Sequence, residues 1–132
     1  MEKIGVVTVT YNSSEVIDKF LEDLFNQKFP NFFLYVVDNA STDNSLEKIN
    51  KLKESRVKII KNSINKGVAS ANNKGISSAL KDNCSHILLL NNDVEFGDNL
   101  FEILIKSIRS DKYSLVSPKI YFFDNQNIIW YA

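Results

Sequence analysis

The sequence predicts an α/β fold in which a mostly parallel sheet is flanked by helices. Two observations support this prediction. Apolar, β-branched segments alternate along the chain with segments whose apolar residues recur at helical spacing. Polar residues also stand directly after several of the apolar segments, at the strand ends where open α/β sheets bind ligands. With 132 residues and no internal repeat or linker-like stretch, the chain is expected to form one domain.

Four short segments are predicted to be the strands of this sheet because they are apolar and rich in β-branched residues. In chain order they are residues 4–9, 32–37, 56–61 and 87–90. The last has four apolar residues in a row, which is typical of a strand buried on both faces. Residues 113–123 predict one or two further strand segments around Pro118, and another element begins at Asn127.

Four helices are predicted from apolar residues that recur on one helical face. Their expected starts are Ser13 or Ser14, Asp43, Gly67, and Asp98 or Asn99; the first ends before Pro30, the second near Lys53 and the third near Lys81. The predicted apolar faces are Val16, Ile17, Phe20, Leu21, Leu24 and Phe25 in the first helix; Leu46, Ile49 and Leu52 in the second; Val68, Ala71, Gly75 and Ala79 in the third; and Leu100, Phe101, Leu104, Ile105 and Ile108 in the fourth.

Composition narrows the classes of function. Sixteen basic and sixteen acidic residues give no formal net charge, which argues against a nucleic-acid partner bound through its phosphates. Cys84 is the single cysteine, so an internal disulfide is excluded and a reducing compartment is favoured. No apolar stretch reaches the ~20 residues that span a bilayer. A cytoplasmic protein is expected, and peripheral association with the inner face of the membrane stays open.

Polar residues cluster after three of the predicted strands. They are Thr10, Tyr11 and Asn12 after the first strand, Asp38 and Asn39 after the second, and Asn91, Asn92 and Asp93 after the fourth. A carboxylate at a strand end can accept a hydrogen bond from a base imide, or it can ligate Mg²⁺ or Mn²⁺. Capping of the next helix is the plainer interpretation, and we prefer it for Ser41, Thr42 and Asn44.

The third helix carries glycine and asparagine, which are poor helix formers, in the stretch "NKGVASANNKGISSAL". Close packing on the sheet would explain the small residues, and so would a ligand at the helix start. If Ala71 and Gly75 face the sheet, Asn72 points toward the pocket. Lys66, just before the helix, is placed to reach a phosphate, although a single lysine is more often solvated surface.

Four stretches together resemble glycosyltransferase family 2 in order and spacing. They are "VVTVTYNS", "YVVDNASTDNS", "NKGVASANNKGI" and "ILLLNNDV", and the resemblance covers nearly the whole chain. It implies the GT-A fold and transfer of a sugar from a nucleotide diphosphate donor, with inversion, to an acceptor. The residues that it implies for the nucleotide-sugar site are Thr10, Tyr11, Asn12, Asp38, Asn39, Lys66, Gly67, Asn72, Asn91 and Asn92. Asp93 would bind the divalent metal, Mg²⁺ or Mn²⁺, as the last residue of the family's DXD motif.

The chain departs from the family pattern in two ways. Asn91 replaces the first aspartate of DXD, so the motif brings one fewer negative charge to the metal. No carboxylate falls in the family's later acidic motif, where members keep the general base for the acceptor hydroxyl. The downstream candidates are Glu95, Asp98, Glu102, Asp111 and Asp124. We therefore expect the base beyond residue 132, and we interpret residues 1–132 as the donor-binding part of a single GT-A domain.

Other functions are less well supported. The first predicted strand is not followed by the G-x-G-x-x-G turn of dinucleotide-binding proteins, and no P-loop sequence occurs. The main alternative is a non-catalytic fragment that binds a nucleotide-sugar or a partner chain, with association through an unpaired sheet edge. If the chain is an enzyme, we expect a UDP- or dTDP-sugar donor and a glycan or lipid-linked sugar acceptor, in polysaccharide or cell-surface glycan synthesis.

Overall fold

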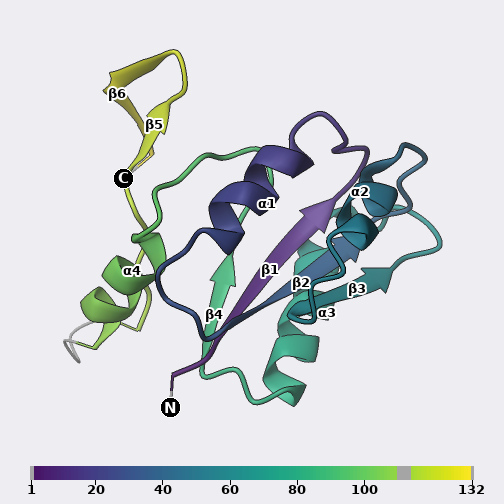
Figure 1. The fold of residues 1–132 in the computed structure, drawn as a ribbon, viewed down its shortest axis with the longest axis horizontal. Coiled ribbons are helices and arrows are strands. Elements are labelled where there is room, and N and C mark those ends of the chain that lie inside the picture. Colours follow the sequence, from purple (N-terminus) through teal and green to yellow (C-terminus); the bar gives the residue numbers. More distant parts are fainter. Residues whose placement is uncertain (1, 110–113, 132) are drawn as a thin grey trace.

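The main sheet consists of four parallel strands, as the sequence predicts. The structure is a computed structural model that describes residues 2–109 and 114–131. The strands are β1 (Ile4–Thr10), β2 (Phe32–Asp38), β3 (Val57–Lys61) and β4 (His86–Leu89). They lie in the order β3-β2-β1-β4 and all pair in parallel, so their carboxyl ends share one edge of the sheet (Figure 1).

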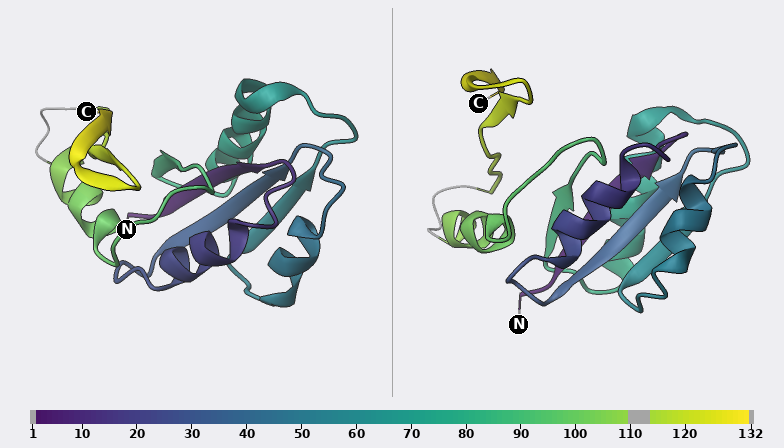
Figure 2. Two further views of the ribbon diagram at one scale, coloured as in Figure 1. Left: turned by 90° about the horizontal axis from the view of Figure 1, so that it is seen from above. Right: turned by 45° about the horizontal axis from the view of Figure 1, so that its top comes forward.

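Helices cover both faces of this sheet (Figures 1 and 2). Helices α1 (Ile17–Phe25) and α2 (Ser45–Lys51) lie on one face, α3 (Gly67–Lys81) lies on the other, and α4 (Leu100–Ile108) lies beside β4. The bounds of α3 coincide with the predicted ones. Helix α1 starts later than predicted, because residues 14–16 form a turn in which Ser13 C=O accepts the N–H of Val16 at 3.1 Å.

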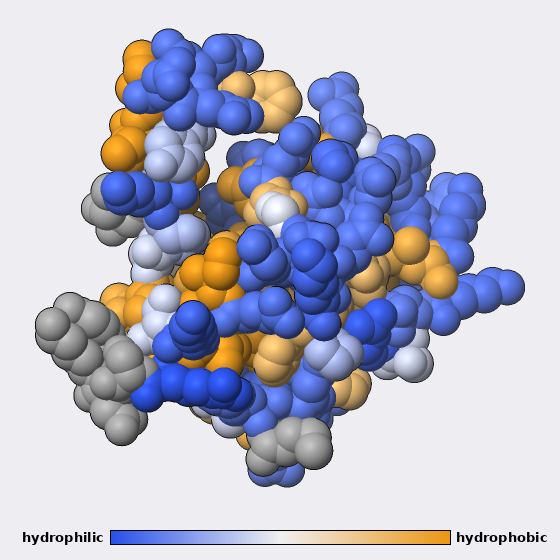
Figure 3. Space-filling view, turned by 60° about the vertical axis from the view of Figure 1, so that its left-hand side comes forward, coloured by the Kyte–Doolittle hydropathy of each residue, from blue (hydrophilic) through white to orange (hydrophobic). Residues whose placement is uncertain are grey.

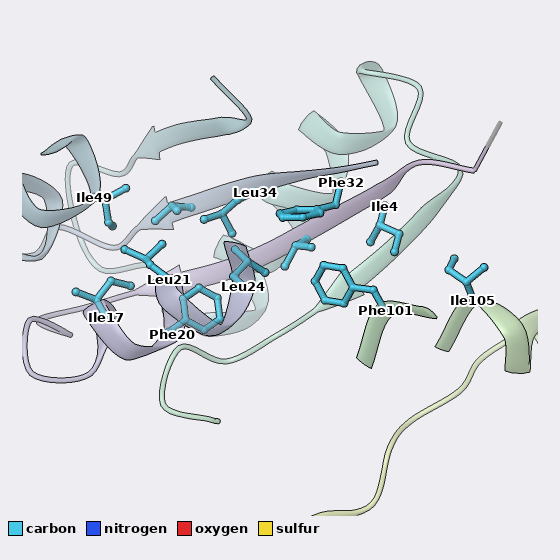
Figure 4. Close-up of a cluster of buried hydrophobic side chains, with 12 residues drawn as sticks. Ile4, Ile17, Phe20, Leu21, Leu24, Phe32, Leu34, Ile49, Phe101 and Ile105 are labelled. Carbon is cyan, nitrogen blue, oxygen red and sulfur yellow. The ribbon is translucent and has the colours of Figure 1, made fainter. Parts of the chain in front are cut away.

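The larger core cluster fills the space between the sheet and helices α1, α2 and α4 (Figure 4). Its ring contacts include Phe32 against Phe101, edge to face, with centroids 5.2 Å apart. The predicted inward residues Phe20, Leu24 and Ile49 are buried, as expected. By contrast Val16 and Leu52, at the ends of their helical patterns, are 37% and 43% exposed, so their predicted burial is wrong.

Helix α3 packs closely on the sheet, which explains its small residues. A Cβ at Gly75 would lie 2.3 Å from Val7 Cγ1, a distance at which atoms overlap. Ala71 and Ala79 are fully buried, as predicted. Val68 is 60% exposed, so its predicted contact with the sheet is wrong; it lies in the first turn of the helix.

Strand β4 is less buried than its apolar sequence predicts. Leu89 is 51% exposed, while Ile87 and Leu88 are only half-buried. The reason is position, because β4 is an edge of the sheet in the part of the chain described here and pairs with β1 alone. The expectation of a strand buried on both faces is therefore wrong for these residues.

The C-terminal strands form a separate hairpin. β5 (Ile120–Phe122) and β6 (Asn125–Tyr131) pair antiparallel and project away from the main sheet in both Figures 1 and 2. Phe123 is 76% and Trp130 63% exposed, and the space-filling view shows apolar atoms on this projecting arm (Figure 3). Tyr113 and Asp111 lie outside the described residues. None of the helices in the described ranges is both long and apolar enough to cross a membrane.

Candidate functional site

Hydrogen bonds join the loops that follow β1 and β2 at the carboxyl edge of the sheet. We call residues 11–16 and 39–44 the paired loops. Asn12 Oδ1 accepts from the backbone N–H of Thr42 at 2.8 Å, and the Asn12 N–H donates to Ser41 Oγ at 3.0 Å. The N–H of Ser14 donates to Asp43 Oδ2 at 2.9 Å. These bonds link positions about thirty residues apart, so each loop fixes the other.

Asp43 is the charged centre of the paired loops. Its Oδ1 accepts the N–H and the hydroxyl of Ser45 at 3.0 and 2.5 Å. Burial raises the pKa of Asp43, but hydrogen bonds from Ser45 and Ser14 outweigh this effect and lower the pKa to about 2. The predicted helix-capping role is wrong for Ser41 and Thr42, which instead form hydrogen bonds with Asn12. Asn44 is the N-cap residue of α2, as predicted, although its side chain makes no capping hydrogen bond.

Asp38 lies at the end of β2, in register with Thr10 of β1. Both are buried, with Asp38 only 3% exposed. Asp38 Oδ2 accepts the N–H of Ser41 at 3.2 Å, whereas Oδ1 is buried and has no hydrogen-bond partner among the described residues. A buried carboxylate oxygen without a donor is costly. Asp38 is therefore the group at this edge that most needs a donor from outside the protein.

Asn39 belongs to a chain of side-chain amides on the opposite side of β2. Its Nδ2 donates to Gly67 C=O at 3.3 Å, and its Oδ1 accepts from Asn62 Nδ2 at 2.8 Å. Lys74 Nζ in turn donates to Asn62 Oδ1. Asn39 and Asn62 are 2% and 6% exposed. This network ties the end of β2 to the start of α3, where Gly67 adopts a φ of 78° that favours glycine.

The loop between β4 and α4, residues 90–99, carries the predicted metal residue. Asn92 is 8% exposed, and its Nδ2 donates to Val9 C=O, Thr10 Oγ1 and Ser13 Oγ at 3.1 to 3.2 Å. The residues on either side, Asn91 and Asp93, are exposed. Asn92 therefore fixes the start of the β4–α4 loop to β1 and leaves its neighbours open to solvent.

The structure brings most of the predicted site residues to one edge, and it separates them by environment. Thr10, Asn12, Asp38, Asn39, Gly67 and Asn92 share the hydrogen-bond networks described above. Tyr11 is 53% exposed beside them, and the N–H of Lys66 lies 3.5 Å from Asn39 Oδ1. Asn72 is half-buried on α3, one turn further along the helix.

Sequence reasoning missed two residues of this edge. Asn62 follows β3 directly, so the rule that picked out Asp38 at a strand end would also have found Asn62. Ser45 is fully buried and donates to Asp43, while its Oγ accepts the N–H of Ser13 at 2.9 Å. Ser45 lies in a serine- and asparagine-rich stretch whose composition is typical of an ordinary loop, so its sequence gave no sign of this role.

No group of three His, Cys, Asp or Glu side chains placed to hold a metal occurs within residues 2–109 and 114–131. Cys84 is buried beside Tyr35, with Sγ 3.5 Å from the phenol oxygen, and His86 Nδ1 lies 3.0 Å from Ser85 Oγ. Each of these two side chains thus lies against a hydrogen-bonding neighbour, which is consistent with a structural role. The downstream carboxylates Glu95, Asp98, Glu102 and Asp124 are exposed, and Asp111 is not among the described residues.

Comparison with known proteins places this geometry in a family. The family model described as "Glycosyl transferase family 2" matches residues 5–131. The chain is 34% identical over 67 residues to the Escherichia coli UDP-Glc:alpha-D-GlcNAc-diphosphoundecaprenol beta-1,3-glucosyltransferase WfaP, covering 51% of this chain and 27% of WfaP. It is 27% identical over 128 residues to the glycosyltransferase GlyG of Streptococcus pneumoniae, covering 96% of this chain and 42% of GlyG. The chain thus spans less than half the length of these curated relatives.

Solved structures agree with this assignment at the level of fold. Residues 1–349 of Staphylococcus aureus TarS, solved in complex with UDP-GlcNAc, superpose with a TM-score of 0.72 at 20% identity, over 94% of this chain and 42% of that one. The sheet with its flanking helices therefore has the GT-A-like fold that the sequence predicts. Because the family model matches nearly its whole length, this chain belongs to glycosyl transferase family 2.

Proposed function

We propose that this chain is the donor-binding part of a glycosyltransferase that transfers a sugar from a nucleotide diphosphate to an acceptor in polysaccharide or cell-surface glycan synthesis. The observation that carries the proposal is Asp38 Oδ1, a buried carboxylate oxygen without a partner in the described structure. A base imide N–H supplies the missing donor. Uracil and thymine both carry such a group, which favours UDP- or dTDP-sugars.

The surroundings of Asp38 suit a nucleotide. Tyr11 is exposed next to Thr10, the residue in register with Asp38, and it offers a planar ring for stacking on a base. Asn39, the residue after Asp38, is hydrogen-bonded to Lys66 and Gly67 at the start of α3. A donor whose base contacts Asp38 therefore has a cationic side chain available for its phosphates. The donor of WfaP is UDP-Glc and TarS was solved with UDP-GlcNAc, which supports the same class here.

A divalent metal, Mg²⁺ or Mn²⁺, fits the β4–α4 loop only as a site shared with the donor. Asp93 is the one carboxylate of Asn91-Asn92-Asp93, and Asn91 adds an amide oxygen. Magnesium is commonly held by one or two carboxylates together with substrate phosphates, so Asp93 and the donor diphosphate together form a reasonable ligand set. The metal, when bound, neutralises charge on the leaving diphosphate. The similar GT-A structure of a Pyrobaculum calidifontis mannosyltransferase was solved with GDP-Man and Mn²⁺.

Calorimetric titration with UDP, dTDP and GDP, with and without Mn²⁺, tests this proposal. We expect one uridine or thymidine nucleotide to bind, and to bind more weakly without metal or in Asp93→Ala. Asp98→Ala is the matched control, because Asp98 is another exposed aspartate of the same loop and its side chain forms an ion pair with Lys28 at the surface. Absence of binding by every nucleotide to a folded chain would overturn the proposal.

A second candidate function is that of a partner-binding fragment without chemistry. The observation that favours it is the β5–β6 hairpin, whose exposed Phe123 and Trp130 are unusual for a free surface. In that case the chain binds no nucleotide and self-associates as its concentration rises, and Phe123→Ser lowers the association. Light scattering of the same samples used for titration separates the two functions.

A further inference from the structure

Gln27 is a buried polar residue that lies outside every stretch resembling the family. It follows the C-terminus of α1 and is 7% exposed. Its Nε2 donates to Gly97 C=O at 2.7 Å and to Asp23 C=O at 3.2 Å, while its Oε1 accepts the N–H of Phe101 at 3.1 Å. Two of these three partners belong to the segment that follows Asp93. One side chain just after α1 thus holds both the end of the β4–α4 loop and the start of α4.

The bond to Phe101 takes the place of a helix cap. The first N–H groups of a helix have no partner within the helix and need one from elsewhere. Asn99, at the N-cap position of α4, makes no side-chain capping bond. Gln27 Oε1 satisfies one of these donors from the segment that follows α1, so the position of α4 depends on that segment.

Other contacts hold the same segment to α1. The N–H of Phe96 donates to Asp23 Oδ2 at 3.2 Å, and the N–H of Lys28 donates to Asp98 C=O at 2.8 Å. The ring of Phe96 packs edge to face on Phe20, with centroids 6.2 Å apart. Residues 96–98 are therefore each held by a hydrogen bond to α1 or to the two residues Gln27 and Lys28 beyond its C-cap.

The β4–α4 loop is thus fixed on both sides of Asp93. Asn92 ties its start to β1, and Gln27 with Asp23 ties its end to α1. Only residues 93–95 lie between these two attachments. Three residues offer little freedom, so the two attachments set where the backbone at Asp93 lies.

We infer that Gln27 is a positioning residue for the metal site, acting through Gly97 to hold Asp93 where the donor diphosphate binds. This inference rests on the proposed function. A positioning role of Gln27 differs from a purely structural role in one measurable effect on nucleotide binding. Loss of the bond to Gly97 weakens the metal-dependent part of nucleotide binding and leaves the contacts at Asp38 unchanged, because the hydrogen bonds of the Gln27 side chain go to Asp23, Gly97 and Phe101 and not to the paired loops.

The test compares Gln27→Glu with wild type and with Lys28→Met. Glutamate retains an acceptor for the N–H of Phe101 but loses the donor to Gly97 C=O. Lys28→Met removes an exposed ion pair of the adjacent residue and leaves the Lys28 backbone N–H in place. UDP and dTDP affinities are measured by calorimetry over a series of Mn²⁺ concentrations, and amide hydrogen exchange of residues 96–101 is measured without metal or nucleotide.

For Gln27→Glu we expect a rise of about 5- to 10-fold in the Mn²⁺ concentration at which tight nucleotide binding is half-restored. This rise is equivalent to a loss of roughly 1 kcal/mol in the free energy of metal binding. Affinity without metal should stay within about 2-fold of wild type, and exchange of residues 96–101 should quicken. Lys28→Met should match wild type in all three. If Gln27→Glu does not fold, Asp23→Ala, which removes the acceptor of the Phe96 N–H, replaces it with the same expected pattern.

Two results would overturn the inference while sparing the proposed function. One is an unchanged Mn²⁺ dependence despite faster exchange, which would make Gln27 a structural cap only. The other is an equal loss of affinity with and without metal, which would indicate a general disturbance of the fold. Absence of nucleotide binding by wild type would instead reject the proposed function, and the inference with it.

Discussion

The paired loops and the β4–α4 loop lie at the same edge of the sheet but are built differently. In the paired loops the side chains of Asn12 and Asp43 hold backbone groups, and Asp38 beside them is buried. In the β4–α4 loop the attachments lie at the ends, and Asn91 and Asp93 are exposed between them. The paired loops form their hydrogen bonds without a ligand, and beside them only the Oδ1 of Asp38 lacks a partner among the described residues. In the β4–α4 loop the carboxylate of Asp93 is exposed to water.

This difference has a consequence for the order of binding. A site that is already ordered loses little conformational entropy when its ligand arrives, so the paired loops can bind a base on their own. A single exposed carboxylate attracts a divalent cation weakly and needs further oxygen ligands. We therefore expect nucleotide to bind weakly without metal, and metal to bind well only when nucleotide is present.

The largest expected effect comes from Asp38→Asn, which tests the buried half of this comparison. The substitution keeps the size of the side chain but removes the charged acceptor for a base imide. Hydrogen bonds to charged groups contribute ~2 kcal/mol, so nucleotide affinity should fall by roughly 30-fold. Thermal stability without ligand should rise, because a buried charge with an unpartnered oxygen is replaced by a neutral amide. Calorimetry and thermal unfolding measure the two opposite changes.

Asp82→Asn is the matched control for that experiment. Asp82 follows α3 at the far end of the sheet, where it accepts from Tyr35 Oη at 2.7 Å and from Lys58 Nζ. Removing its charge should lower stability and leave nucleotide affinity unchanged. A fall in stability with unchanged nucleotide affinity for Asp38→Asn, as expected for Asp82→Asn, would mean that Asp38 is structural and has no role in binding.

A somewhat smaller effect is expected from breaking the contact between the paired loops at Asn12. Asn12 has a φ of 52°, a conformation that asparagine tolerates better than alanine, and its Oδ1 accepts from two backbone N–H groups. Asn12→Ala loses the acceptor and strains the backbone, at a cost of about 2 kcal/mol of unfolding free energy. Asn12→Gly loses only the acceptor, at about 1 kcal/mol.

Urea unfolding of both Asn12 variants measures these costs. The difference between them isolates the backbone conformation from the hydrogen bonds. Equal stability of Asn12→Ala and wild type would show that the bonds between the paired loops do not hold them together. Metal dependence of nucleotide binding should be unaffected in either variant, since the hydrogen bonds of Asn12 go to Ser41, Thr42 and Asp43.

The same two regions show what could be predicted from sequence. Strand ends followed by polar residues located both regions, because carboxyl ends of parallel strands meet at one edge. The sequence did not reveal that Asp38 and Asn39 serve opposite sides of the sheet. Successive side chains of a strand point to opposite faces of the sheet, so the Asp38 side chain contacts Ser41 of the paired loops and the Asn39 side chain contacts the start of α3. The face to which each side chain points depends on where β2 ends.

The remaining misses have a common physical cause. Exposure of Leu89 and of the β5–β6 hairpin depends on which strands pair, and apolar composition is the same whether a strand is central or at an edge. The role of Gln27 depends on contacts with residues about seventy positions away. By contrast, the bounds of α3 were predictable because Gly67 and its small-residue face are local features.

Acid should weaken the paired loops selectively. The pKa of Asp43 is lowered to about 2 in the folded chain, below the ordinary value of 3.8. A carboxyl group with a lowered pKa contributes stability that is present above about pH 4 and is lost as pH falls toward 2. Asp43→Asn should therefore lower the urea midpoint at pH 7 and flatten its dependence between pH 4 and 2.

Glu54→Gln is the matched control for this pH dependence. The side-chain hydrogen bond from Arg56 lowers the pKa of Glu54 to about 2, and Glu54 lies just before β3, at the opposite edge of the sheet. Its replacement should flatten the same pH range without changing nucleotide affinity. A pH profile of Asp43→Asn parallel to that of wild type would show that the carboxylate does not hold the paired loops.

The smallest expected effect is at Ala40, which has a φ of 65° between Asp38 and its hydrogen-bonded partner Ser41. Alanine in this conformation costs ~1 kcal/mol, which glycine avoids. Glycine also increases the conformational entropy of the unfolded chain, and this effect offsets part of the gain in stability. Ala40→Gly should therefore stabilise the chain slightly. It should also loosen the Asp38–Ser41 turn and lower nucleotide affinity by about 2- to 3-fold through lost ordering.

Lys53→Gly, at a φ of 49° beyond the end of α2, should give the same gain in stability with no change in affinity. Thermal unfolding and calorimetry of the two variants show whether strain at Ala40 serves the binding site, because only then do the variants differ in affinity.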